Sequence, residues 1–294
     1  MELARKATHD ANWKEAAGRW NEIFLRSDVH EREACVETVR ALIGLGDGAS
    51  AQHLAELGVR KFPGDSVLHE LRGRALEAQG LHATAEAAYE NALRFAPDRA
   101  SAVLALAKVR CELGLPAAAL ELLTPRLEAG HGTAAEFLLA ATAHRSMRHT
   151  AQAFVSYERA FSLEKPGLEH LLEAAALYGD ASIRKQDAHA AALAGEWANR
   201  ALALDPQATM AHVVLGWLAE DAGHDARAAE CHRRAVETDP ACVVALSALA
   251  AAQARRGELE DSKAMAERAL ALEQDPAKRA ELEKLAHPTT PSDG

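Results

Sequence analysis

The chain has 294 residues, 49% of them hydrophobic and 26% charged, a composition typical of a soluble protein that buries enough apolar surface to fold. Its formal net charge of −10 argues against a general nucleic-acid binder, because such proteins neutralise phosphates with Lys and Arg. The cysteines form no CxxC pair, so the sequence predicts neither a zinc site nor a disulfide framework; they are Cys35, Cys111, Cys231 and Cys242.

The chain begins with MELARKATHD, which has no apolar segment after its charges and so lacks the pattern of a secretory leader. No later stretch approaches the roughly 20 apolar residues that a membrane-spanning helix needs. Unless a leader has already been removed, we expect a cytoplasmic protein without a membrane span.

A period of 34 residues runs along the chain, which is the signature of a repeat architecture. Glycine recurs at this interval at Gly46, Gly80 and Gly114, and again at Gly223 and Gly257. A small residue follows five positions later, at Ala51, Ala85, Ala119 and Ala153, and then at Ala194, Ala228 and Ser262. Proline keeps the interval between Pro63 and Pro97, and between Pro206 and Pro240.

Each recurring residue type has a physical reason. Glycine tolerates the positive φ that a tight turn between two helices requires. Alanine lets the second helix approach the first closely. Proline ends the second helix, because it donates no N–H and disfavours helix in the preceding residue. Aspartates beside the prolines are predicted to act as turn or cap residues; they are Asp65, Asp98, Asp205 and Asp239.

With these residues in the same places, the chain resembles the tetratricopeptide repeat (TPR) family, whose unit is two antiparallel helices in 34 residues. Residues 66–99 match best, with Gly73, Ala85, Tyr89, Ala92 and Pro97. Residues 209–242 carry Gly216, Ala228, Ala235 and Pro240, and residues 134–167 carry Ala153, Tyr157, Ala160 and a displaced Pro166. The resemblance implies an all-α fold, an α-solenoid in which antiparallel helix pairs form a right-handed superhelix.

We predict a single domain over residues 1–286 with about seven full repeats. The predicted units are a partial one over 1–30, then 32–65, 66–99, 100–133, 134–167, 168–208, 209–242 and 243–276, followed by a capping helix over 277–286 and a disordered tail over 287–294. Two departures from the pattern stand out. Arg148 replaces the turn glycine in the fifth unit, and the sixth unit has seven extra residues around Gly179 to Asp187, which predicts a lengthened helix.

In the TPR family the first helix of each unit lines a concave groove, mainly through the second, fifth, ninth and twelfth positions. Carried onto this sequence, these positions place four cations along the groove: Arg40, Arg74, Lys108 and Arg145. We predict that they grip an acidic or carboxylate-bearing segment through charge-assisted hydrogen bonds. The alternative is that Arg74 pairs with Glu70 and Glu77 on its own helix and that the other cations are solvated.

The same numbering predicts an apolar stretch towards the C-terminal half of the groove. It comprises Leu104, Leu138, Leu172 and Val213 at fifth positions and Trp217 at a ninth position. Trp217 is the favoured anchor, because large aromatic side chains often dominate interfaces. The alternative is that some of these side chains belong to the core and that the register is wrong by one residue.

Several other functions find no support in the sequence. The Lys and Asn clamp with which some TPR proteins hold a chaperone tail is missing from the fifth and ninth positions, where the pairs are Val36 with Arg40, Glu70 with Arg74, and Leu104 with Lys108. No HExxH, phosphate-binding loop or GxSxG motif occurs. We therefore expect no enzyme activity, no metal and no cofactor.

The sequence thus predicts a non-catalytic scaffold or adaptor that binds a protein or peptide, with acidic and apolar segments, in its concave groove. One alternative is the recruitment arm of a multi-component enzyme or of an export or assembly complex. Another is a self-assembling structural repeat that forms homo-oligomers. Nucleic acid is not an expected partner.

Overall fold

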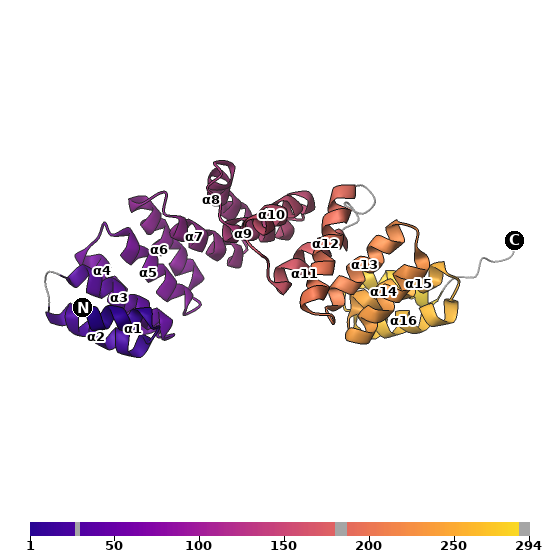
Figure 1. Cartoon of the computed structure of the whole chain (residues 1–294), viewed down its shortest axis with the longest axis horizontal. Helices are drawn as coiled ribbons and strands as arrows, with labels where there is room; N and C mark the ends of the chain where they lie inside the picture. Colours follow the sequence, from indigo (N-terminus) through magenta and orange to yellow (C-terminus); the bar gives the residue numbers. More distant parts are fainter. Residues whose placement is uncertain (27–29, 180–186, 288–294) are drawn as a thin grey trace. The chain divides into compact units, whose positions relative to one another are not determined.

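The computed structural model describes residues 1–26, 30–179 and 187–287. Every secondary-structure element among these residues is a helix, and successive helices form pairs joined by short turns (Figure 1). The chain divides into two compact units, residues 1–148 and residues 149–294, called the N-terminal unit and the C-terminal unit. The predicted class, an all-α array of antiparallel helix pairs, is confirmed. The prediction that one domain spans residues 1–286 stays a prediction.

The N-terminal unit contains nine helices in its described residues. They are α1 (Glu2–His9), α2 (Trp13–Arg26), α3 (Glu31–Gly44), α4 (Gly48–Lys61), α5 (Ser66–Glu77), α6 (His82–Phe95), α7 (Ala100–Glu112), α8 (Pro116–Glu128) and α9 (Ala134–Ser146). The first helices of successive repeats are α3, α5, α7 and α9, and the exposed surface that they form is called the first-helix face.

The C-terminal unit continues the same alternation. It contains α10 (Thr150–Leu163), α11 (Leu168–Ala176), the 3₁₀ turn η1 (Leu177–Gly179), α12 (Ala188–Leu204), α13 (Thr209–Asp221), α14 (Asp225–Thr238), α15 (Val243–Arg255), α16 (Leu259–Leu272) and α17 (Pro276–Ala286). Its first helices are α11, α13 and α15, which form its own first-helix face. The helices α5, α7, α9, α11, α13 and α15 begin at residues 66, 100, 134, 168, 209 and 243, the starts predicted from the 34-residue period and the seven extra residues of the sixth unit.

The turn glycines have the conformation that the sequence predicts. Gly46, Gly80, Gly114, Gly223 and Gly257 all have φ between 74° and 78°. Arg148, which replaces glycine at this place, has a φ of 59°. The arginine therefore keeps the left-handed turn, at a conformational cost of roughly 1–2 kcal/mol that glycine would avoid.

The small residues five positions after each turn are buried, and where both helices of a pair belong to one unit they lie where the two helices meet. All six alanines are completely buried, and they are Ala51, Ala85, Ala119, Ala153, Ala194 and Ala228. Ser262, in the same place, is 1% exposed, and its hydroxyl donates a hydrogen bond of 2.8 Å to the carbonyl oxygen of Ala250. The predicted close contact between paired helices of one unit is confirmed.

Side chains cap several helices at their N-termini, where backbone N–H groups lack helical partners. The carboxylate of Asp65 accepts from the amides of Val67 and Leu68 at the start of α5. Thr133 and Glu136 form a reciprocal capping box at the start of α9. These contacts set the point at which each first helix begins.

The second helix of the sixth repeat, α12, begins at Ala188, directly after the predicted insertion. α12 has 17 residues, whereas the other second helices have 13 or 14. α12 is therefore longer by three or four residues, but residues 180–186 of the insertion lie outside the described residues, so a helix lengthened by all seven stays a prediction. The predicted capping helix is α17, whose Leu282 and Ala286 are 3% and 1% exposed. The predicted tail over 287–294 also lies outside them, apart from His287.

Candidate functional site

Three of the predicted cations occupy one place on consecutive first helices of the N-terminal unit. Arg40 lies on α3, Arg74 on α5 and Lys108 on α7, and all three side chains are exposed. Because they are spaced by one repeat, they form a row along the first-helix face. We call these three residues the basic row.

The members of the basic row differ in how far their charges are neutralised. Arg40 Nη1 lies 2.6 Å from Glu37 Oε1 on its own helix. Lys108 Nζ lies 2.5 Å from Glu77 Oε1 and 3.6 Å from Glu112 Oε1. The hydrogen bond with Glu77 raises the pKa of Lys108, so its ammonium group remains charged at any physiological pH.

Arg74 forms no ion pair with any residue that the structure describes. The alternative prediction, that it pairs with Glu70 and Glu77, is wrong because both carboxylates have other partners. Glu70 pairs with Arg99, and Glu77 pairs with Lys108. The Arg74 guanidinium therefore keeps its hydrogen-bond donors available to a ligand.

A pocket of about 300 Å³ opens between the first two members of the basic row. Its lining combines the two arginines with apolar side chains, the carboxylate of Glu37 and the hydroxyl of Thr8; the lining residues are Thr8, Trp13, Glu37, Arg40, Ile43, Gly44, Leu71 and Arg74. Trp13 lies so close to α3 that a Cβ on Gly44 would be 2.7 Å from its ring. This pocket, called the N-terminal pocket, can therefore receive an apolar group and a carboxylate together.

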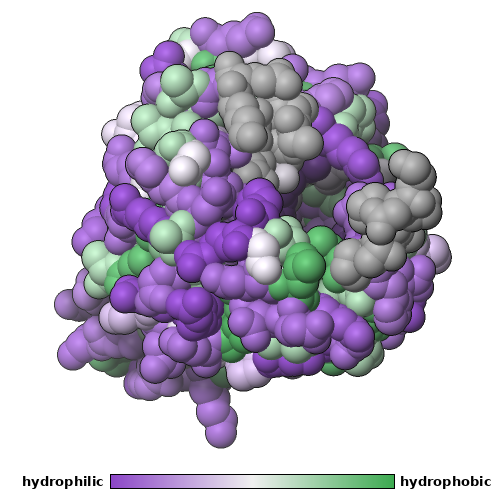
Figure 2. Space-filling view, turned by 90° about the vertical axis from the view of Figure 1, so that its right-hand side faces the viewer, coloured by the Kyte–Doolittle hydropathy of each residue, from purple (hydrophilic) through white to green (hydrophobic). Residues whose placement is uncertain are grey.

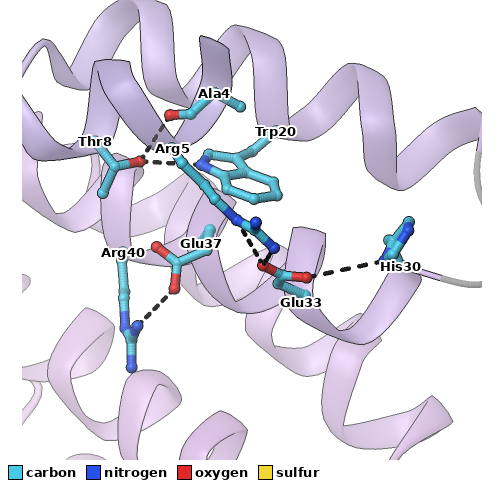
Figure 3. A network of polar contacts seen from close by, with 8 residues as sticks. All are labelled: Ala4, Arg5, Thr8, Trp20, His30, Glu33, Glu37 and Arg40. Carbon is cyan, nitrogen blue, oxygen red and sulfur yellow. Dashed lines mark hydrogen bonds and ion pairs between the residues drawn. The ribbon is translucent and has the colours of Figure 1, made fainter. Parts of the chain in front are cut away.

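Polar contacts hold the N-terminal helices in place beside this pocket (Figure 3). Arg5 on α1 lies 2.8 Å from Glu33 on α3. The indole N–H of Trp20 donates to the hydroxyl of Thr8 at 3.0 Å, and that hydroxyl donates in turn to a backbone carbonyl of α1. Figure 3 also shows Arg40 directed away from this cluster, bound to Glu37 on one side only.

The C-terminal unit has a larger pocket, of about 470 Å³. It lies on the first-helix face of this unit and is also lined by α17. Its lining residues are Gly179, Trp217, Glu220, Val243, Val244, Ser247, Ala248, Ala251, Arg255, Glu273, Lys278, Glu281, Leu282 and Leu285. We call it the C-terminal pocket.

Most charges at the C-terminal pocket are already engaged. Glu220 Oε1 lies 3.0 Å from Nε2 of the buried His232 and 2.5 Å from Nη2 of Arg255. Lys278 Nζ lies 3.9 Å from Glu273 Oε2. These contacts fix the carboxylate of Glu220 on α13 against both α14 and α15.

Nothing in the described part of the chain resembles a metal centre, since no three His, Cys, Asp or Glu side chains lie close enough together to hold an ion. Within the same part, no helix is both long enough and apolar enough to cross a bilayer.

Solved structures of low sequence identity share the arrangement of helix pairs. The C-terminal part of a TPR repeat-containing protein from Cytophaga hutchinsonii aligns with 84% of this chain and 98% of its own, with a TM-score of 0.64 and 14% identity. YrrB, described as a TPR protein with an unusual peptide-binding site, aligns with 65% of this chain and 95% of its own, with a TM-score of 0.58 and 17% identity. This chain has the tetratricopeptide-repeat fold.

A tetratricopeptide repeat protein from Parabacteroides merdae gives the same result, with 87% of this chain and 98% of its own aligned, a TM-score of 0.53 and 17% identity. No family model and no curated protein matches the sequence. Low identity with a shared fold is expected of tetratricopeptide-repeat arrays, because a few small and turn-forming positions are enough to specify each helix pair.

The prediction that Val213 lines the binding groove is wrong. Val213 is completely buried, and it packs in a core cluster of the C-terminal unit with Leu246 and Leu282. A side chain without exposed surface cannot contact a partner. Trp217, one helical turn further along α13, is half-buried and lines the C-terminal pocket.

The other predicted residues lie apart from both pockets. Leu104 on α7, Leu138 on α9 and Leu172 on α11 are half-buried, as is Arg145 on α9, and none of them lines the N-terminal or the C-terminal pocket. The first two leucines and Arg145 belong to the N-terminal unit, and Leu172 belongs to the C-terminal unit. Their contact with a partner stays a prediction.

Sequence reasoning missed several residues of the C-terminal pocket. Glu220, Val244 and Ser247 occupy first-helix positions of the tetratricopeptide repeat that the numbering already marks as groove-lining, so the signal was present. Lys278 and Glu281 lie on α17, which is not the first helix of a repeat. Only the packing of the capping helix could place them in the pocket.

Proposed function

We propose that this chain is a non-catalytic interaction scaffold that holds a segment of a partner protein against the first-helix faces of its repeats. The observation that carries the proposal is the exposed Arg74, which has no ion-pair partner among the described residues and lies between two other cations. An exposed charge of this kind adds little to stability. It is well suited to bind a carboxylate.

The surroundings of Arg74 support a partner segment that is both acidic and apolar. The N-terminal pocket places Arg40 and Arg74 beside Trp13, Ile43 and Leu71. A carboxylate on the partner would receive charge-assisted hydrogen bonds, and a neighbouring apolar side chain would be removed from water. The peptide-binding site named for YrrB, a protein of the same fold, supports a peptide as the class of ligand.

Partner capture from cells of the source organism tests the proposal. We expect the Arg40→Gln/Arg74→Gln variant, immobilised as the whole chain, to retain about 5- to 10-fold less of the proteins captured by the wild type, as measured by quantitative mass spectrometry. Helix content and melting temperature should be almost unchanged, because both arginines are exposed.

The matched control is the Arg60→Gln/Arg94→Gln variant, which removes two exposed arginines from the second helices α4 and α6 of the same repeats. Its capture should equal that of the wild type. Equal capture by both variants would refute the role of the basic row.

Light scattering over a range of concentrations separates partner binding from self-assembly. Both the recruitment-arm alternative and the cytoplasmic location remain predictions.

A further inference from the structure

The C-terminal pocket is lined by small residues of one helix and by one large aromatic side chain. Ser247, Ala248 and Ala251 on α15 form part of its lining, and their short side chains leave space above the helix. Trp217 is held against the chain at Gly179, where a Cβ would lie 2.7 Å from the indole ring. The walls are set by packing, so the pocket does not depend on a ligand for its shape.

Apolar surface is available in this pocket. Trp217 and Leu285 are half-buried, and Val244 is 39% exposed. Figure 2, which views the molecule from the side of the C-terminal unit, shows a mainly hydrophilic surface on which apolar side chains gather only in small groups. A pocket of this size with a few accessible apolar side chains suits the insertion of one side chain and not a broad apolar contact.

Several charged side chains around the pocket have ion-pair partners among the described residues, and one carboxylate does not. Glu220 is bonded to His232 and Arg255, and Lys278 lies beside Glu273. Glu281 on α17 is exposed and forms no hydrogen bond or ion pair with any described residue. The unpaired charge at this pocket is therefore negative, whereas the unpaired charge at the N-terminal pocket is positive.

We propose that the C-terminal pocket binds a partner segment in which a large apolar side chain is closely followed or preceded by Lys or Arg. The apolar side chain enters the space between Trp217 and α15, and the cation pairs with Glu281 on the rim. This inference rests on the proposed function and adds the chemistry of the ligand to it.

Charge complementarity favours a cation over an anion in this place. An anionic neighbour would meet the unpaired carboxylate of Glu281, whereas a cation would gain a partner without breaking an existing ion pair. The net charge of −10 adds a general attraction for basic segments. The partner expected here is therefore the opposite in charge from the one expected at the N-terminal pocket.

A phage-displayed library of random dodecapeptides, selected against the whole chain, tests this inference. We expect one class of enriched peptides to pair a large apolar residue with Lys or Arg. The best of these peptides is labelled with fluorescein and titrated by fluorescence polarisation. We expect it to bind the Glu281→Gln variant about 3- to 10-fold more weakly than the wild type. Trp217→Ala should weaken the same peptide by about tenfold or more.

Glu283→Gln is the matched control, because Glu283 is an exposed glutamate of the same helix that does not line the pocket. Binding unchanged in Glu283→Gln but weakened in Glu281→Gln supports the inference. Peptides that bind without a basic residue, or without sensitivity to Glu281→Gln, overturn the inference and leave the proposed function in place. If no peptide is enriched at all, both the inference and the proposed function are overturned. If the chain self-associates and Trp217→Ala abolishes that association, the pocket binds a second copy of this chain instead.

Discussion

At the scale of single residues, the contact between a ring and a glycine determines how closely two helices pack. A Cβ on Gly73 would lie 2.6 Å from the ring of Tyr89, and one on Gly216 would lie 2.2 Å from the ring of His232. Each ring also reaches a glutamate at the end of the facing first helix, and Tyr89 Oη donates to its glutamate at 2.9 Å. Histidine can thus replace tyrosine where the glycine and the carboxylate are both present.

A second residue-scale feature is the buried carboxylate of Glu136. Burial alone would raise its pKa, but hydrogen bonds from Arg126 and Thr133 outweigh that effect and hold the pKa below its usual range. Arg126 Nε lies 2.6 Å from Glu136 Oε1, and the carboxylate is 1% exposed. The ionised form is therefore the one that stabilises the fold.

Replacing Glu136 by Gln should lower the free energy of unfolding at neutral pH by about 2 kcal/mol, because Arg126 loses its charged partner. The unfolded glutamate has a pKa of about 4.3, and the folded value is lower. The contribution is therefore complete above about pH 5 and is lost as the pH falls through the folded pKa. Urea titrations between about pH 3 and pH 7, with exposed Glu121→Gln as control, measure it. A deficit independent of pH would contradict this account.

At the scale of helices, the second helices show how the array buries a continuous stripe. In α6 the buried residues are Ala85, Ala88, Tyr89 and Ala92, spaced as on one face of a helix. The stripe is made mostly of alanine, so the second helix lies close to the first. Tight contact between backbones leaves no room for a larger side chain.

Ala85→Trp should therefore destabilise the chain by about 1–3 kcal/mol or more, since overpacking forces neighbouring side chains or helices to move. Ala87→Trp, an exposed position on the same helix, should change stability by less than about 0.5 kcal/mol. Chemical denaturation followed by circular dichroism compares the two variants. Equal stability of both would mean that the assignment of the buried stripe is wrong.

At the scale of the whole molecule, the extensive contacts among the described helices connect those that are adjacent or next to adjacent in the chain. Stability in such an array is close to a sum of terms for single repeats and for their immediate neighbours. The chain also divides at residue 148 into two compact units, each with its own internal contacts. A destabilising substitution in one repeat should therefore lower stability mainly in that repeat and its immediate neighbours.

Hydrogen exchange of the Ala85→Trp variant checks this locality. Under conditions in which the variant remains folded, protection should fall in α5, α6 and α7, because these helices pack around the altered position. Protection in α13 to α16 should match that of the wild type. A uniform loss of protection over the whole chain would show that the array unfolds as a single cooperative body.

The sequence by itself determined the helices and their pairing. Turn glycines, close-contact alanines and caps act within one repeat, and a 34-residue period repeats the same local solution. The roles of residues such as Gly80, Ala85 and Asp65 can therefore be predicted without knowledge of distant contacts. The register of the first helices was also readable from it, which placed Arg40, Arg74 and Lys108 on one exposed row.

Only the tertiary structure decided which charges remain unpaired and which apolar side chains are reachable. Glu70 pairs with Arg99, directly before α7, and Glu77 pairs with Lys108 on α7, so Arg74 is left without them. Val213 is enclosed by neighbouring helices, although it shares its repeat position with the half-buried Leu104, Leu138 and Leu172. α17 adds Glu281 to a pocket that the repeat pattern does not include. Ion pairing and burial depend on the side chains of adjoining elements, which no single repeat encodes.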